Sequence, residues 1–177
     1  IPAALVMTMS KMIFSIISQE YPESTKELLG NVNNQMRGLL LDTQYITAFY
    51  SIYNPENQTI TISNAGHALP LFYRASKKKV LALDSFGYFV GIADDSVYEE
   101  KVLKVEPGDR LFMYTDGITE IKNKEKEEYG ENRLAKFIIN NPDIKGDEFC
   151  DALLNDVESF AKLDYRDDDI AFLNIEF

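Results

Sequence analysis

The stretch Tyr114-Thr115-Asp116-Gly117-Ile118-Thr119-Glu120 continues an apolar run, residues 109–114, that predicts a buried strand. Gly117 directly after Asp116 lets the backbone turn sharply away from the end of that strand. The pattern therefore predicts that Asp116 presents its carboxylate at a sheet edge, on a rigid element and open to solvent. A hard cation needs that kind of oxygen ligand, but one acid cannot hold it alone.

The best partner for Asp116 is the acidic run Asp167-Asp168-Asp169, which directly precedes an apolar strand predicted for residues 170–175. If the two strands lie side by side in one sheet, their acids could converge on a cation. Each motif alone also has a simpler interpretation, because Asp-Gly is a common turn and an acidic run is commonly a solvated loop. The prediction of a metal site therefore depends on the two motifs occurring together.

Length and composition favour a single domain over residues 1–177, because a chain of 177 residues that is 45% hydrophobic can bury a sizeable core. The single Cys150 excludes an internal disulfide and fits a reducing compartment, so a cytoplasmic location is expected. The net charge of −11 argues against nucleic acid as a partner. No apolar run approaches the roughly 20 residues of a membrane span. An anionic substrate would be repelled unless bound cations reversed the local field.

Hydrophobic periodicity and turn residues predict the other elements. Alternating segments predict strands at residues 45–53, 59–64, 71–74, 80–83, 98–105 and 170–177. Helical patterns predict helices at residues 2–19, 24–39 and 131–140, and a further helix after Gly146. The residues Lys77-Lys78-Lys79 are expected to form a solvated hairpin tip.

Three helices carry more detailed expectations. The first, residues 2–19, is apolar all round, so it is expected to pack between layers. The second opens with a capping box, Ser24-Thr25-Lys26-Glu27. Asp147 is the expected N-cap of the helix that follows Gly146.

The order of five motifs resembles the bacterial SpoIIE-like branch of the metal-dependent type-2C serine/threonine phosphatases. The motifs are Asn64-Ala65-Gly66-His67, Pro107-Gly108-Asp109, the stretch 114–120, Tyr129-Gly130 and Asp168-Asp169-Ile170-Ala171. The resemblance implies an α+β fold, a four-layer α-β-β-α sandwich of mostly antiparallel strands, of which this chain is the C-terminal portion. It also implies that Asp116 and Asp168 are ligands of Mn²⁺ or Mg²⁺, with two ions in the complete domain.

The sequence departs from this family in two places. In the family, a Gly-Asp…Gly-His/Lys-Gly motif, whose Asp bridges the two metals, ends just before a helix that begins like Ile1-Pro2-Ala3-Ala4-Leu5. We therefore expect the fold to be incomplete at its N-terminus, with the bridging ligand and two central strands in an upstream segment. Strands 45–53 and 110–115 are expected to need those two as partners. Ala171 stands where the family commonly has Thr.

The chemistry that the resemblance implies uses a metal-activated water, so no side chain is assigned as a catalytic acid or base. Four residues could support the site without holding the ion: Gly117, Glu120, Asp169 and His67. His67 could supply a proton to the leaving group, but a structural role in tying a bend is favoured. Glu120 could orient a metal-bound water, or it could simply be an exposed acid at a helix start.

Two classes of function follow. The first is a phosphoserine or phosphothreonine protein phosphatase that acts as a signalling output domain. By family analogy its substrate is a phosphorylated anti-sigma-factor antagonist, and a sensor or receiver domain lies upstream; a dimer is possible. The alternative is a non-catalytic, phosphatase-like domain that only binds a partner. The presence of both Asp116 and Asp168 favours the enzyme.

Overall fold

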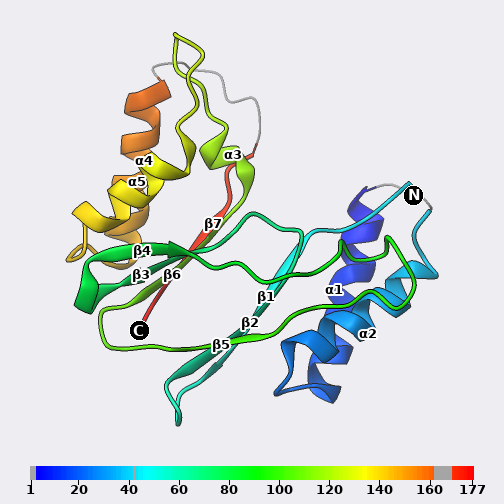
Figure 1. Ribbon diagram of the computed structural model, residues 1–177. Helices are drawn as coiled ribbons and strands as arrows, with labels where there is room; N and C mark the ends of the chain where they lie inside the picture. The colour runs from blue at the N-terminus through cyan, green and yellow to red at the C-terminus, as the bar shows by residue number, and fades with distance from the viewer. Residues whose placement is uncertain (1–2, 42, 162–168) are drawn as a thin grey trace. The chain divides into compact units, whose positions relative to one another are not determined.

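A computed structural model describes residues 3–41, 43–161 and 169–177 of the chain (Figure 1). These residues form two compact units. The first consists of Ile1–His67 with Asp84–Val105, and the second of Ala68–Leu83 with Glu106–Phe177. Within the described part of the chain, no helix is both long and apolar enough to cross a membrane.

The first unit contains a three-stranded antiparallel sheet in the order β1-β2-β5, formed by β1 (Ala48–Asn54), β2 (Thr59–Ala65) and β5 (Lys101–Lys104). The helix α2 (Thr25–Arg37) packs against β1 and β2, and α1 (Ala3–Glu20) packs against α2. The buried side chains of this core come from both helices, from β2, and from the segments after α2 and before β5: Ile13, Ile17, Leu28, Leu29, Val32, Met36, Leu40, Ala65, Val90 and Tyr98.

The first helix differs from its prediction. Only Ile13 and Ile17, four residues apart and therefore on one stripe of the helix, are buried. Leu5, Met12 and Ile16 are 51%, 61% and 53% exposed. The expectation that α1 packs between two layers is therefore wrong within the described structure. An all-round apolar sequence gave no information on which stripe would be covered.

The N-terminus of α2 confirms half of the predicted capping box, because the Ser24 hydroxyl accepts a hydrogen bond from the Glu27 amide at 3.3 Å. The carboxylate that completes the cap comes not from Glu27 but from Glu100, far along the chain. Its carboxylate accepts from the Ser24 hydroxyl at 3.0 Å and from the Thr25 hydroxyl and Lys26 amide, both at 3.2 Å. Partial burial pushes the pKa of Glu100 up, but these hydrogen bonds outweigh it and the pKa is lowered overall.

Replacing Glu100 with Gln is expected to destabilise the chain at pH 7 by at most about 1 kcal/mol, the usual size of a helix-cap contribution, reduced here by solvent screening. A carboxyl group with a lowered folded-state pKa contributes stability above its ordinary pKa of 4.5 and loses it as pH falls through the folded-state pKa. In urea unfolding, the gap between wild type and Glu100→Gln should therefore be present at pH 7 and close in strong acid.

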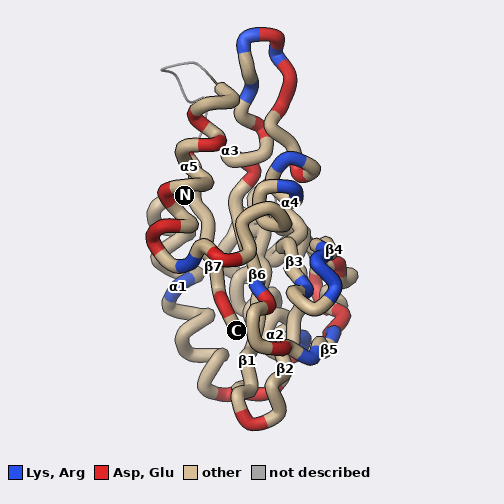
Figure 2. The backbone as a smooth tube through the Cα atoms, turned by 90° about the vertical axis from the view of Figure 1, so that its left-hand side faces the viewer, with Lys and Arg blue, Asp and Glu red and all other residues tan. Residues whose placement is uncertain are grey.

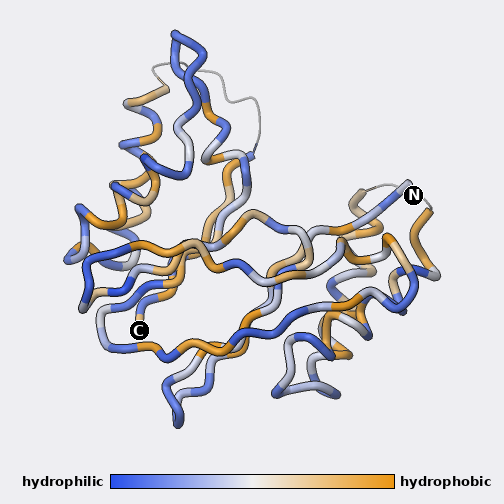
Figure 3. The backbone as a smooth tube through the Cα atoms, in the orientation of Figure 1, coloured by the Kyte–Doolittle hydropathy of each residue, from blue (hydrophilic) through white to orange (hydrophobic). Residues whose placement is uncertain are grey.

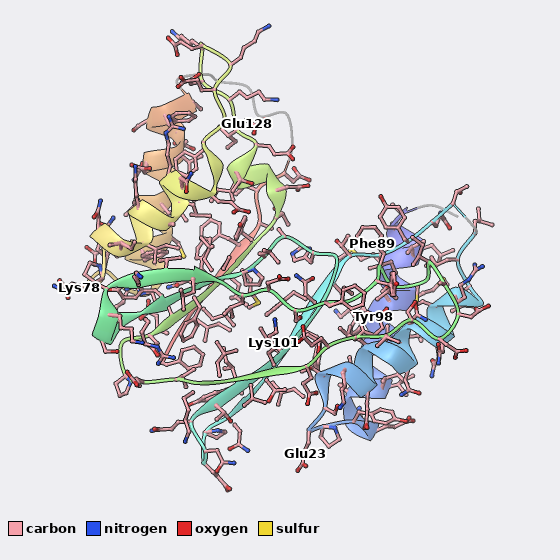
Figure 4. All side chains as sticks on the ribbon, viewed as in Figure 1. Glu23, Lys78, Phe89, Tyr98, Lys101 and Glu128 are labelled. Atoms are coloured by element: carbon pink, nitrogen blue, oxygen red, sulfur yellow. The ribbon has the colours of Figure 1, made fainter. Side chains whose placement is uncertain are left out.

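Glu23→Gln is the matched control for this prediction, because Glu23 is an exposed acid in the turn before α2 (Figure 4). Its effect should be near zero at every pH. Equal losses in the two variants, or a gap that does not change with pH, would contradict the assignment of Glu100 as the cap.

The second unit contains a four-stranded antiparallel sheet in the order β4-β3-β6-β7. Its strands are β3 (Leu71–Arg74), β4 (Lys79–Ala82), β6 (Arg110–Tyr114) and β7 (Phe172–Glu176). Its helices are the short η1 (Ala75–Lys77) and α3 (Asp116–Thr119), followed by α4 (Gly130–Asn140) and α5 (Gly146–Ala161). Strands β3, β6 and β7 are largely hydrophobic (Figure 3).

Alternate residues of β3 and β6 form the core of the second unit together with one stripe of each long helix. The buried set is Leu71, Tyr73, Phe112, Tyr114, Ile118, Tyr129, Leu134, Ile138, Phe149, Leu153 and Val157. Because side chains of a strand alternate between faces, this set shows that α4 and α5 cover the same face of the sheet. Charged residues gather away from this core, on the 122–128 loop and on the lysine tip between β3 and β4 (Figure 2).

The predicted α+β class with mostly antiparallel strands is confirmed, since every strand ladder is antiparallel and each unit has one sheet with its own helices. The lysine hairpin is also confirmed, with Lys78 in the left-handed region at φ 48° and its side chain at the tip (Figure 4). Two further predictions are wrong. Helix α5 begins at Gly146, so Asp147 lies in its first turn. Strand β6 does not need a further partner, because β3 and β7 flank it.

The turn that leads into β6 is organised by a buried acid, Asp109, which is 0% exposed. Its carboxylate accepts from the Arg74 guanidinium at 2.5 Å and from the backbone amides of Ala75 and Glu106, both at 2.9 Å. The next residue, Arg110, is also buried. It donates to backbone carbonyls of residues 141, 142 and 144, and its guanidinium lies 4.5 Å from the Phe149 ring centre. Both charges therefore hold loops to the sheet.

Candidate metal centre

The two strands predicted to carry the site are direct neighbours. β6 and β7 are antiparallel, and their pairing runs from Arg110↔Glu176 to Tyr114↔Phe172 (Figure 1). The C-terminal end of β6 therefore lies at the N-terminal start of β7. This confirms the predicted side-by-side arrangement of the strand before Asp116 and the strand after the acidic run.

The contact between the two strand ends continues beyond the last pair of the ladder. The Thr115 amide donates to the Ala171 carbonyl at 2.9 Å, and the Ala171 amide donates to the Thr115 hydroxyl at 3.1 Å. At Gly117, a Cβ atom would lie 2.2 Å from the carbonyl oxygen of Asp169, a distance that real side chains do not reach. Glycine is therefore required at position 117, because the backbone of residue 169 lies directly against it.

Asp116 is the first residue of the short turn α3, and it is exposed. Its backbone carbonyl accepts from the Glu120 amide at 2.9 Å and from the Thr119 hydroxyl at 3.1 Å. Glu120 is thus the C-terminal cap of this turn, and the suggestion that it is a helix-start acid is wrong. Its side chain is exposed, and a role in orienting a metal-bound water stays a prediction.

The second predicted ligand, Asp168, lies outside the described residues, so its pairing with Asp116 stays a prediction. Asp169 is described, and its side chain is exposed. Among the described residues, no three His, Cys, Asp or Glu side chains are close enough together to hold a metal ion. The carboxylates of Asp116 and Asp169 suit a hard divalent cation chemically, since Mg²⁺ and Mn²⁺ prefer oxygen ligands.

His67 belongs to the first unit and ends a tight bend after β2. The Asn64 side chain accepts from the His67 amide at 2.8 Å and donates to its carbonyl at 3.0 Å. The imidazole Nδ1 lies 3.3 Å from the Thr47 hydroxyl. The Asn64 side chain holds the bend through backbone atoms of His67, so for the imidazole both the structural role and a role in a metal site stay predictions.

Two residues make hydrogen bonds that were not predicted from the sequence. No role was assigned to Thr115, although a hydroxyl residue directly before a strand-end acid is a signal that could have been used. None was assigned to Asn64 either. An Asn three residues before the end of a Gly-containing bend is well placed to bond the backbone, and it does so here.

Comparison with solved structures identifies the fold. The PP2C domain of SiaA from Pseudomonas aeruginosa matches 100% of this chain and 71% of that chain, with a TM-score of 0.87 and 17% identity. The phosphatase domain of the cell fate determinant SpoIIE from Bacillus subtilis matches 99% of this chain and 74% of that one, with a TM-score of 0.63 and 17% identity. The fold is therefore the α+β sandwich of PP2C-type protein phosphatase domains.

The sequence places the chain within this class. A family model described as Stage II sporulation protein E (SpoIIE) matches residues 1–177, and the chain belongs to that family. The phosphoserine phosphatase RsbU of Bacillus subtilis (strain 168) is 29% identical over 127 residues, which are 70% of this chain and 37% of RsbU. Protein IcfG of Synechocystis sp. is 29% identical over 131 residues, 74% of this chain and 20% of IcfG. The chain thus corresponds to a minor part of either relative.

Proposed function

We propose that residues 1–177 belong to one phosphatase domain that dephosphorylates phosphoserine or phosphothreonine in a protein substrate, with Mn²⁺ or Mg²⁺ as cofactor. The observation that carries this proposal is the pairing of β6 with β7, which brings the backbone of Asp169 against Gly117, next to Asp116. We further propose that Asp168, which precedes Asp169 in the sequence, supplies the second carboxylate. The match of the SpoIIE family model to the whole chain supports the activity.

The residues at the strand ends would each make a distinct contribution. Asp116 and Asp168 would hold the cations, which when bound activate a water and neutralise the charge of the phosphoryl group. Gly117 permits the close approach of the two backbones, and Thr115 holds them in register. Glu120, at the end of the turn that begins with Asp116, would accept a hydrogen bond from a water near the cations. Cations at this edge would also offset the repulsion between an anionic substrate and a chain of net charge −11.

The proposed substrate is a phosphorylated anti-sigma-factor antagonist. The proposed context is a dimeric cytoplasmic signalling protein with an upstream sensor or receiver domain. Two comparisons support this choice. The relative RsbU is named a phosphoserine phosphatase. A Mycobacterium tuberculosis protein whose solved structure contains RsbU and RsbW domains matches 98% of this chain and 47% of that one, with a TM-score of 0.75 and 19% identity.

The test is a phosphatase assay on the full-length protein that carries these residues, with Mn²⁺ or Mg²⁺ added to metal-stripped enzyme. We expect phosphate release from a phosphoserine protein to require the metal, to stop with a chelator, and to be much weaker with a phosphotyrosine protein. Metal-independent release would contradict the proposed chemistry. Absence of any release, together with tight binding of a phosphoprotein, would favour the non-catalytic alternative.

A further inference from the structure

The hydroxyl of Thr115 connects the C-terminal end of β6 to the segment just before β7 by side-chain hydrogen bonds. It accepts from the Ala171 amide at 3.1 Å, and its single proton has two carbonyl acceptors within reach, that of Ala171 at 3.3 Å and that of Asp169 at 3.5 Å. The regular ladder ends one residue earlier, at Tyr114↔Phe172. The backbone bond from the Thr115 amide to the Ala171 carbonyl, at 2.9 Å, extends the pairing by one residue, and the hydroxyl adds a side-chain connection at the same place, next to the residues that carry the acids.

The position of this hydroxyl matters because Thr115 and Asp116 are consecutive, as are Asp169, Ile170 and Ala171. If the start of β7 shifted relative to the end of β6, the distance between the Asp116 carboxylate and the carboxylates before β7 would change. Metal-binding groups must be held within about 0.5 Å of their working geometry, and packing and hydrogen bonds around the ligands do this. Ala171 has no side-chain hydroxyl, so the polar side chain of this contact comes from Thr115.

We infer that Thr115 is a positioning residue for the metal centre, acting through its hydroxyl to fix the distance between Asp116 and the acid-bearing start of β7. This inference rests on the proposed function, because it assigns Thr115 to the same site. Thr115 does not touch the substrate or the cation in this account. Its effect is on how tightly the carboxylates are held in the geometry that binds the ion.

A purely structural role for Thr115 makes a different prediction. If the hydroxyl only seals the end of the sheet, its loss would lower the stability of the metal-free fold and leave metal affinity unchanged. Thr119 provides the comparison, because its hydroxyl bonds to the Asp116 carbonyl at 3.1 Å within the same turn. Thr119 is therefore a control of the same residue type, close to Asp116. Its hydrogen bond stays within α3 and does not reach the segment before β7.

The experiment compares Thr115→Val, Thr115→Ser and Thr119→Val in the full-length protein. Hydrogen exchange of the Ala171 amide is measured without metal, and the dissociation constant for Mn²⁺ is measured by calorimetry. We expect Thr115→Val to speed exchange at Ala171 and to weaken Mn²⁺ binding roughly tenfold, the usual size for loss of a residue that orients ligands. Thr115→Ser should stay within about twofold of wild type, as should Thr119→Val.

The outcomes separate this inference from the proposed function. If wild type binds Mn²⁺ and Thr115→Val binds it equally well, the inference is overturned and the proposed function stands. If wild type does not bind Mn²⁺, both are overturned. If Thr115→Val does not fold, Thr115→Ala replaces it in the comparison, and failure of both to fold without metal shows that the hydroxyl is structural and overturns the inference.

Discussion

Asp116→Asn is expected to lower metal-dependent phosphatase activity by more than roughly 100-fold, because loss of a ligand should exceed the 10- to 100-fold cost of losing a residue that only orients ligands. The neutral amide keeps the shape of the side chain but provides a much weaker ligand for a hard cation. Since Asp116 is exposed and bonds to α3 through its backbone, the fold should be unaffected. The measurement is kcat and KM on a phosphoserine protein, with the midpoint of thermal unfolding recorded without metal.

Two further variants provide activities with which that of Asp116→Asn is compared. Glu125→Gln removes an exposed acid from a loop of the same unit and should leave activity unchanged. Glu120→Gln should have an intermediate effect if Glu120 orients a metal-bound water, and none if it is only the cap of the turn. Activity of Asp116→Asn within about tenfold of wild type, at saturating Mn²⁺, would remove Asp116 from the ligand set, because even orienting residues have effects of that size.

Prediction from the sequence was most accurate for the parts of the fold that are determined by local patterns. The alternation of residues in 45–53 and 59–64, with a turn between them, is sufficient to define the hairpin β1–β2. The apolar runs beside Asp116 and after the acidic run predicted the pair β6–β7. β6 is largely buried, whereas the residues of β7 are half-buried or exposed. A strand end followed by Asp-Gly then predicted one of the two proposed ligands, Asp116.

Predictions from sequence failed where distant residues decide the structure. The N-terminus of α2 is completed by Glu100, 74 residues beyond Lys26, and nothing near Ser24 could indicate that partner. The buried stripe of α1 depends on where α2 packs, which its own all-round apolar sequence does not encode. The role of Thr115 depends on Ala171, 56 residues away, so it became visible only with the strand pairing.

Asp109→Ala is expected to destabilise the second unit by about 3 kcal/mol or more, the usual cost of removing one partner from a buried ion pair. Asp109 is fully buried, and its loss would leave the Arg74 guanidinium without its 2.5 Å contact and the amides of Ala75 and Glu106 without acceptors. Arg74 would keep a weaker contact with the exposed Glu106, at 3.7 Å, which limits the loss. The measurement is the free energy of unfolding in urea, without metal.

The matched control for Asp109→Ala is Glu106→Gln, which removes the more exposed acid that faces the same guanidinium and should cost at most about 1 kcal/mol. The pair Arg74→Met and Asp109→Ala should be less destabilising together than the sum of the single effects, because the double variant leaves no buried charge unpaired. Equal losses for Asp109→Ala and Glu106→Gln would show that the buried carboxylate does not organise the turn into β6. The segment Pro107-Gly108-Asp109 would then be only a turn.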